Sequence, residues 1–127
     1  MDTSQTYIVA CGKAGEIQRD HEFIYGDVWT DNSEEAYIVL PLHFPVSGCV
    51  WLPRQDQLQE MVFGFQYPDN DNDTKLAQLI SDFYNFTMST YRRYFTSMEQ
   101  LWLAFVMKEL YTKEWDGNEW VKNVCVA

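Results

Sequence analysis

The chain has 127 residues, a length that fits one domain, and we expect residues 1–127 to form a single domain. Aromatic residues make up 17% of the chain, and acidic residues outnumber basic ones 19 to 9, which gives a formal net charge of −10. This composition excludes a collagen-like or low-complexity chain and a basic nucleic-acid-binding protein, so no direct binding to nucleic acid is expected. The three cysteines have no short spacing, which favours reduced thiols over a disulfide scaffold.

The ends of the sequence and its hydropathy predict a cytoplasmic protein. Residues 1–6 contain no basic segment followed by an apolar run, so we expect no signal peptide. The densest apolar run, residues 101–107, is far shorter than the ~18 residues that a membrane-spanning helix requires. We therefore expect a protein of the cytosol without a membrane partner.

The first half of the chain is predicted to be rich in strands. Runs of β-branched, aromatic and other apolar residues indicate strands at residues 6–11, 23–29, 36–44 and 46–52. Turn-forming residues at 30–34 separate two of them. These strands are expected to form a small, mainly antiparallel sheet.

The second half is predicted to be helical, because its apolar residues recur at spacings of three and four. Pro53 is expected to open the first helix, and a longer one is expected from about residue 75 to 92 or 94. Its predicted buried face is wide and is formed by Leu76, Leu79, Ile80, Phe83, Tyr84, Thr87, Met88, Tyr91 and Phe95.

A third helix is predicted to form the centre of the core. Thr96 and Glu99 form a predicted capping box at its start, and the helix is expected to end near Tyr111. Its apolar residues occupy nearly all sides of the helix. A turn at 116–117 and a final strand at 120–126 follow. The expected fold class is α+β, with the N-terminal sheet packed by two or three C-terminal helices.

The negative charge is concentrated in the N-terminal half: residues 1–63 carry −7 and residues 64–127 carry −3. Carboxylates on a rigid face can imitate the phosphates of nucleic acid and attract a basic protein, whereas a merely solvating surface is the alternative interpretation. The candidate interaction surface is formed by Glu16, Asp20, Glu22, Asp27, Trp29, Asp31, Glu34 and Glu35.

No residue spacing indicates a catalytic, cofactor or metal site, and none is predicted. Two histidines and two cysteines, His21, His43, Cys11 and Cys49, lack the short spacings of metal ligands, although a Cys–His pair could form through folding. Residues 69–73 alternate Asp and Asn as in a calcium loop, but the glycine and glutamate that such a loop needs are absent. Glycine-rich phosphate-binding patterns are also absent.

The aromatic excess has two interpretations. Trp102 and Phe105 lie at helical spacing and are predicted to be core residues. Trp115 and Trp120 flank a turn and, if exposed, would suit an interface between copies of the chain. The core interpretation is favoured for all of them.

Two segments, residues 51–61 and 97–120, have distinctive sequences. The first is WLPRQDQLQEM, and the second begins with SMEQLWLAFVMKE. They resemble small uncharacterised proteins carried by phages and prophages of gut-type bacteria. The resemblance implies a bacterial host cytosol and an accessory or counter-defence role, and it implies no catalytic residues.

The leading hypothesis is that the chain is a non-enzymatic acidic binding protein that acts on a basic protein. In its most specific form, the chain is an inhibitor that imitates nucleic acid. The first alternative is a structural or assembly protein that forms homo-oligomers through exposed aromatic residues. The second is a small hydrolase-type enzyme that uses a histidine or a cysteine.

Overall fold

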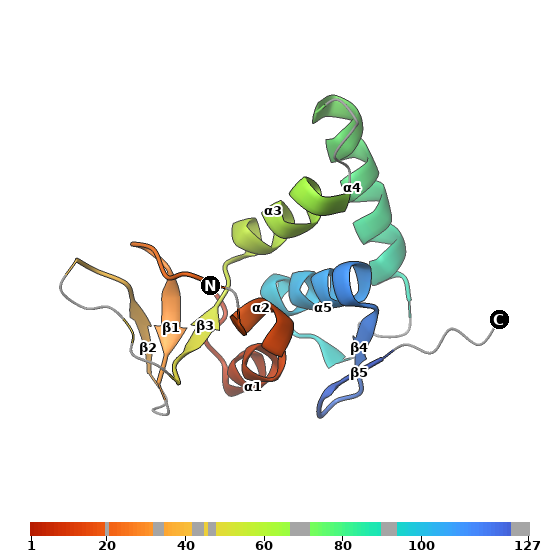
Figure 1. The fold of residues 1–127 in the computed structure, drawn as a ribbon. Helices are drawn as coiled ribbons and strands as arrows, with labels where there is room; N and C mark the ends of the chain where they lie inside the picture. Colours follow the sequence, from red (N-terminus) through yellow and green to blue (C-terminus); the bar gives the residue numbers. More distant parts are fainter. Residues whose placement is uncertain are drawn as a thin grey trace. The chain divides into compact units, whose positions relative to one another are not determined.

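A computed structural model describes residues 1–19, 21–31, 35–41, 45, 48–66, 72–89 and 94–122. The chain divides into two compact units, Met1–Arg54 and Gln55–Ala127 (Figure 1). The described residues form five helices, a three-stranded antiparallel sheet and a two-stranded one, which confirms the α+β class. The single domain over residues 1–127 stays a prediction.

The first unit contains the three-stranded sheet, in the order β2-β1-β3. Strand β1 (Val28–Thr30) pairs antiparallel with β2 (Ala36–Ile38) on one side and with β3 (Val50–Leu52) on the other. All three were predicted, but each is shorter than its apolar run. Residues 42–44, 46 and 47 of the predicted strands lie outside the described residues.

The predicted strand at residues 6–11 is wrong, because this segment forms helix α1 (Gln5–Lys13), followed by the short helix α2 (Gly15–Arg19). The Ser4 side chain caps α1 by accepting a hydrogen bond from the backbone N–H of Tyr7. Tyr7, Ala10 and Cys11 are buried at helical spacing. Packing of this face outweighs the weak strand preference of the β-branched residues in the run.

Side-chain hydrogen bonds join the helices of the first unit to β3. The Tyr7 hydroxyl donates to the backbone carbonyl of Pro53 at 2.6 Å, in a buried position. The Gln18 amide donates to the Trp51 carbonyl at 2.8 Å and accepts from the Trp51 N–H at 2.9 Å. Gln18 therefore satisfies backbone groups at the outer edge of β3 that a further strand would otherwise bind.

The second unit contains helices α3 (Gln55–Gln66), α4 (Asn72–Thr87) and α5 (Met98–Tyr111), followed by a hairpin of β4 (Lys113–Trp115) and β5 (Trp120–Lys122). Strand β4 was not predicted. The turn between β4 and β5 was predicted, and it places Gly117 at φ 99°.

Two helix boundaries differ from the prediction. Helix α4 ends at Thr87, whose hydroxyl donates to the Tyr84 carbonyl and so competes with continuation of the helix. Helix α5 is capped by Ser97 and not by Thr96: the Ser97 hydroxyl accepts from the backbone N–H of Gln100 at 3.1 Å. The Gln100 side chain in turn accepts from the Thr96 N–H, so the capping residues lie one position further along.

Helix α5 forms the centre of the second unit's core, as predicted. The side chains of Leu103, Phe105, Val106 and Met107 have no exposed surface. From α4, the Phe83 ring stacks on Trp102 with the centroids 3.8 Å apart, and Phe105 meets both rings edge-on.

Candidate functional site

The acidic segment is the first candidate, and the structure describes six of the eight residues predicted to form its interaction surface. Glu22, Asp31 and Glu35 are exposed, and Glu16 is partly buried. Asp27 and Trp29 are buried, so these two side chains do not lie on a surface where a partner could meet them. Asp20 and Glu34 lie outside the described residues.

Asp27 is buried because it organises the loop that leads into β1. Its Oδ2 accepts from the Ile24 N–H at 3.0 Å and lies 2.8 Å from Nε2 of His21. Gly26, at φ 91°, provides the left-handed turn that brings Ile24 back to this carboxylate. A buried carboxylate with hydrogen-bond partners stabilises its loop, which is a structural role.

The exposed acids do not form one tight cluster. Asp31 follows β1 and Glu35 precedes β2, so both lie at one end of this hairpin, whereas Glu22 lies in the loop at the other end. An extended strand from Asp27 to Asp31 spans about 13 Å, which exceeds the screening length of about 8 Å at physiological salt. Each unit carries a net charge of −5, with eight acids and three bases in the first and eleven and six in the second.

Two of the four candidate nucleophiles and bases, Cys11 and His21, are held in structural positions. Cys11 is fully buried, and this burial raises the pKa of its thiol well above the ordinary value, so the reactive thiolate is suppressed. His21 contacts Asp27 and stacks on Trp51, with the ring centroids 3.4 Å apart. Cys49 is partly buried and free, and His43 lies outside the described residues. Within the described residues, no group of three or more potential ligands could hold a metal ion.

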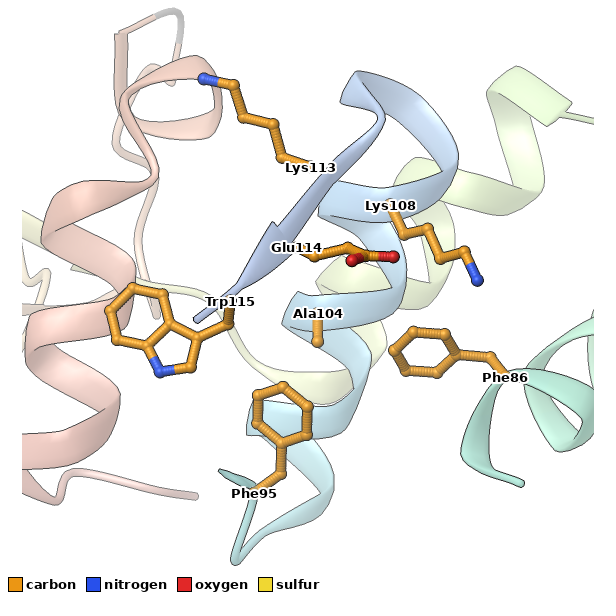
Figure 2. A pocket seen from close by; sticks show the side chains of 7 residues that line it. All are labelled: Phe86, Phe95, Ala104, Lys108, Lys113, Glu114 and Trp115. Carbon is orange, nitrogen blue, oxygen red and sulfur yellow. The ribbon is translucent and has the colours of Figure 1, made fainter. Parts of the chain in front are cut away.

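A cavity in the second unit is too small for a ligand. Its volume is about 10 Å³, which is room for about one water molecule. Figure 2 shows Phe86, Phe95 and Ala104 around a common space, while the Lys113 side chain extends away from them. Lys108 covers the Phe86 ring, with its Nζ 5.5 Å from the ring centroid. The cavity is therefore a packing defect beside α5.

Next to this cavity, an open hollow is lined by Asp82, Asn85, Phe86, Lys108 and Glu109. Partial burial raises the pKa of Glu109, and the nearby negative charge of Asp82 raises it further, while Lys108 lowers it. Two carboxyl groups that repel each other can mark a functional site, but structural clusters of charges raise a pKa in the same way.

Helix α4 carries two separate apolar faces, and only one of them is buried. Leu79 and Phe86 are buried, with Phe83 between them on the same face. The second face is exposed, which corrects the prediction of one wide buried face. We call it the α4 row, and its exposed fractions are 50% for Leu76, 67% for Ile80 and 61% for Tyr84. We include Met88, which is 57% exposed and directly follows the helix, because its backbone N–H still bonds to the Tyr84 carbonyl.

The arrangement of the helices explains why the α4 row is exposed. Successive residues turn by about 100° on a helix, so the row lies about a third of a turn away from the face that contains Phe83. Helices α3 and α5 (Figure 1) meet α4 on the side that carries Lys75 and Phe83, which contact Phe63 and Trp102, and the row lies off this side. The sequence showed the spacing of four residues, but not which of the two faces meets the core.

The exposed aromatic residues are not those that the sequence analysis singled out. Trp115 and Trp120 are 6% and 8% exposed and lie against each other, with the ring centroids 5.0 Å apart. Tyr25 and Tyr84 are the large aromatic side chains exposed among the described residues. The favoured core interpretation is thus confirmed for these two tryptophans, and Tyr84 of the α4 row is the aromatic candidate for an interface in the second unit.

Comparison of the chain with protein-family models, with curated proteins and with solved structures finds no match. The resemblance to phage and prophage proteins therefore stays a prediction. No helix in the described part of the chain is both long and apolar enough to cross a lipid bilayer.

Proposed function

We propose that this chain is a non-enzymatic binding protein that acts by contact with another polypeptide through the α4 row. The observation that carries the proposal is a line of four large apolar side chains, each at least half exposed, of which three lie on α4 and Met88 directly follows its last residue. Covering a half-exposed side chain of this size contributes about 1 kcal/mol to binding. The row is thus a surface whose exposure to water is unfavourable unless a partner covers it.

The state of the polar candidates supports a non-enzymatic role. Cys11 lacks both access to solvent and thiolate character, and the His21 ring is held between Asp27 and Trp51. A catalytic nucleophile needs both an activating base and access to its substrate. Cys11 does not meet the requirement for access, and the His21 ring, which is 17% exposed, is packed against Trp51.

The acidic surface favours a second contact, with a basic protein. The charge of −10 and the exposure of Glu22, Asp31 and Glu35 would attract such a partner over long range and speed its association. The resemblance of residues 51–61 and 97–120 supports a bacterial host cytosol as the setting, in which the chain would serve as an accessory or counter-defence factor of phage or prophage origin.

The α4 row is tested with two matched variants. Ile80→Glu puts a charge into the row, whereas Ile24→Glu makes the same change at an isoleucine that is similarly exposed, at 61%, in the first unit. Immobilised wild-type chain is expected to retain a polypeptide, either an untagged copy of itself or a protein from a bacterial lysate, in 0.5 M salt. Ile80→Glu should lose at least nine-tenths of the retained material, while Ile24→Glu should keep it.

If the two variants retained equal amounts of the polypeptide, the α4 row would be excluded as the contact face. The high salt is chosen because apolar contacts persist in it while contacts between exposed charges are screened.

The acidic contact is tested by neutralising two acids at the end of the β1–β2 hairpin, Asp31→Asn with Glu35→Gln. The control, Glu60→Gln with Glu119→Gln, removes the same charge from exposed positions of the second unit. If the hairpin acids bind a basic partner, retention of that partner in 0.05 M salt should fall several-fold in the hairpin variant only. An equal fall in both variants would mean that the total charge, and not a surface, attracts the partner.

A further inference from the structure

We propose that the partner of the α4 row is a second copy of this chain, which packs against it antiparallel across a two-fold axis. This inference rests on the proposed function and names the occupant of the same surface. Three properties of α4 support it: the symmetry of the row, the position of the charges around the helix, and the size of the exposed face.

Two copies of the row are complementary to each other when they run in opposite directions. Its members are spaced by four residues, so an antiparallel copy places Leu76 opposite Met88 and Ile80 opposite Tyr84. The row spans about 18 Å, and rows of this spacing pack into each other when two helices cross at about −50°. Beside it lie exposed small residues, Ala77 and Ser81, which let a second helix approach closely.

Along the row itself α4 carries little charge. Between residues 76 and 88 the one charged residue is Asp82, while Asp73 and Lys75 precede the row in the first turn of α4. The Lys75 Nζ lies 5.2 Å from the centroid of the Phe63 ring on α3, and Asp82 lies close enough to Glu109 on α5 to raise its pKa. The side chains of Lys75 and Asp82 therefore lie on the side of α4 that meets α3 and α5.

An uncharged face suits a second copy better than it suits a basic protein. Two chains of charge −10 repel each other wherever their acids meet, so they associate most readily through a surface without charge. A basic partner gains nothing from such a surface. Self-association through the row should consequently strengthen as salt screens the repulsion, whereas binding of a basic partner should weaken.

The size of the row sets the strength of the contact. A standard stable interface buries about 800 Å² on each partner. Four half-exposed side chains bury a smaller area, on the order of several hundred Å². We therefore expect a reversible dimer with a Kd on the order of 10–100 µM.

Sedimentation equilibrium of the full chain, from about 1 µM to about 1 mM in 0.05 and 0.5 M NaCl, tests this inference. The wild type should show a monomer–dimer equilibrium, with a Kd several-fold lower at the higher salt. Ile80→Glu should weaken the dimer at least tenfold, and Ile24→Glu should leave it unchanged. The circular dichroism spectrum verifies folding, which should survive because glutamate is a good helix former at an exposed position.

Crosslinking tests the antiparallel arrangement. In a background with Cys49→Ser and Cys125→Ser, chains carrying Ile80→Cys are mixed with chains carrying Tyr84→Cys and are oxidised. Under the proposed arrangement the mixed disulfide should form several-fold faster than either symmetric one. Faster symmetric crosslinks at both positions would overturn it in favour of a parallel pair.

The failure of this inference differs from the failure of the proposed function. A wild type that stays monomeric at about 1 mM in 0.5 M NaCl overturns the dimer. If Ile80→Glu nevertheless abolishes the retention of a different protein, such as one that presents an apolar helix, the row is a binding face with another occupant. If nothing is retained either, both proposals fail.

Discussion

The two units of the molecule are stabilised in different ways. In the first unit, buried polar side chains bind the backbone: Tyr7 reaches Pro53, Gln18 reaches Trp51, and Asp27 holds the loop before β1. In the second unit, stacked and edge-on aromatic rings surround α5. Both units expose large apolar side chains, Ile24, Tyr25, Ile38 and Leu40 in the first as strongly as the α4 row in the second. The row differs because its side chains recur at helical spacing along one element, which gives a continuous face for a partner.

The largest effect is expected when the ring at the centre of the second unit is removed. Phe105→Ala deletes a side chain without exposed surface that contacts Phe83, Phe86 and Trp102. It should lower the free energy of unfolding by about 3–5 kcal/mol, measured by urea denaturation. Tyr84→Ala, at an exposed ring of the same unit, should change it by less than about 0.5 kcal/mol. Equal losses would mean that Tyr84 belongs to the core.

A smaller effect is expected from the polar network of the first unit. Asp27→Ala leaves the Ile24 N–H and the His21 ring without the carboxylate that they contact. The free energy of unfolding, measured by urea denaturation, should fall by about 2–3 kcal/mol, because a buried donor then lacks its acceptor. Asp31→Ala, at an exposed acid of the same segment, should have almost no effect. A neutral result at Asp27 would show that the loop does not depend on this carboxylate.

The smallest effect concerns Glu109, whose pKa is raised by burial and by Asp82. Because the folded state binds this proton more tightly than the unfolded state, stability should fall as the pH rises from the ordinary glutamate pKa through the raised one. Glu109→Gln removes this dependence and should raise the Tm by about 1–2 °C at pH 7, with no gain at pH 3. Calorimetry at the two pH values measures it, with Glu60→Gln as the exposed control. A gain that is equal at both pH values would exclude the titration of Glu109 as its cause.

How far the sequence could predict the structure depends on the kind of interaction. The central helix was predicted because a capping signal at residues 96–99 precedes the apolar run at 101–107, which alone would also fit a buried strand. The run at residues 6–11 fits either a strand or a helix by propensity, and the cap at Ser4 was the signal for the helix that was overlooked. The buried position of Asp27 could not be predicted, since it depends on a partner, His21, that only the folded loop brings close.

The candidate site shows the same limit. The spacing of α4 predicted an amphipathic helix, but two apolar rows fit that spacing equally well, and only the packing of Phe83 on Trp102 decides which row is covered. The acidic segment looked continuous in sequence, yet folding buries Asp27 and leaves Asp31 and Glu22 at different ends of a hairpin.

The central claim is that the α4 row is a contact face between copies of the chain and not part of the fold. Thermal unfolding as a function of protein concentration tests it most directly, because association of folded chains makes the Tm rise with concentration. The wild-type Tm should increase by a few degrees between about 5 µM and about 1 mM, while the Ile80→Glu Tm should equal the wild-type value at 5 µM and stay constant. An Ile80→Glu variant that unfolds many degrees lower at 5 µM, or a wild-type Tm that does not depend on concentration, would contradict the account.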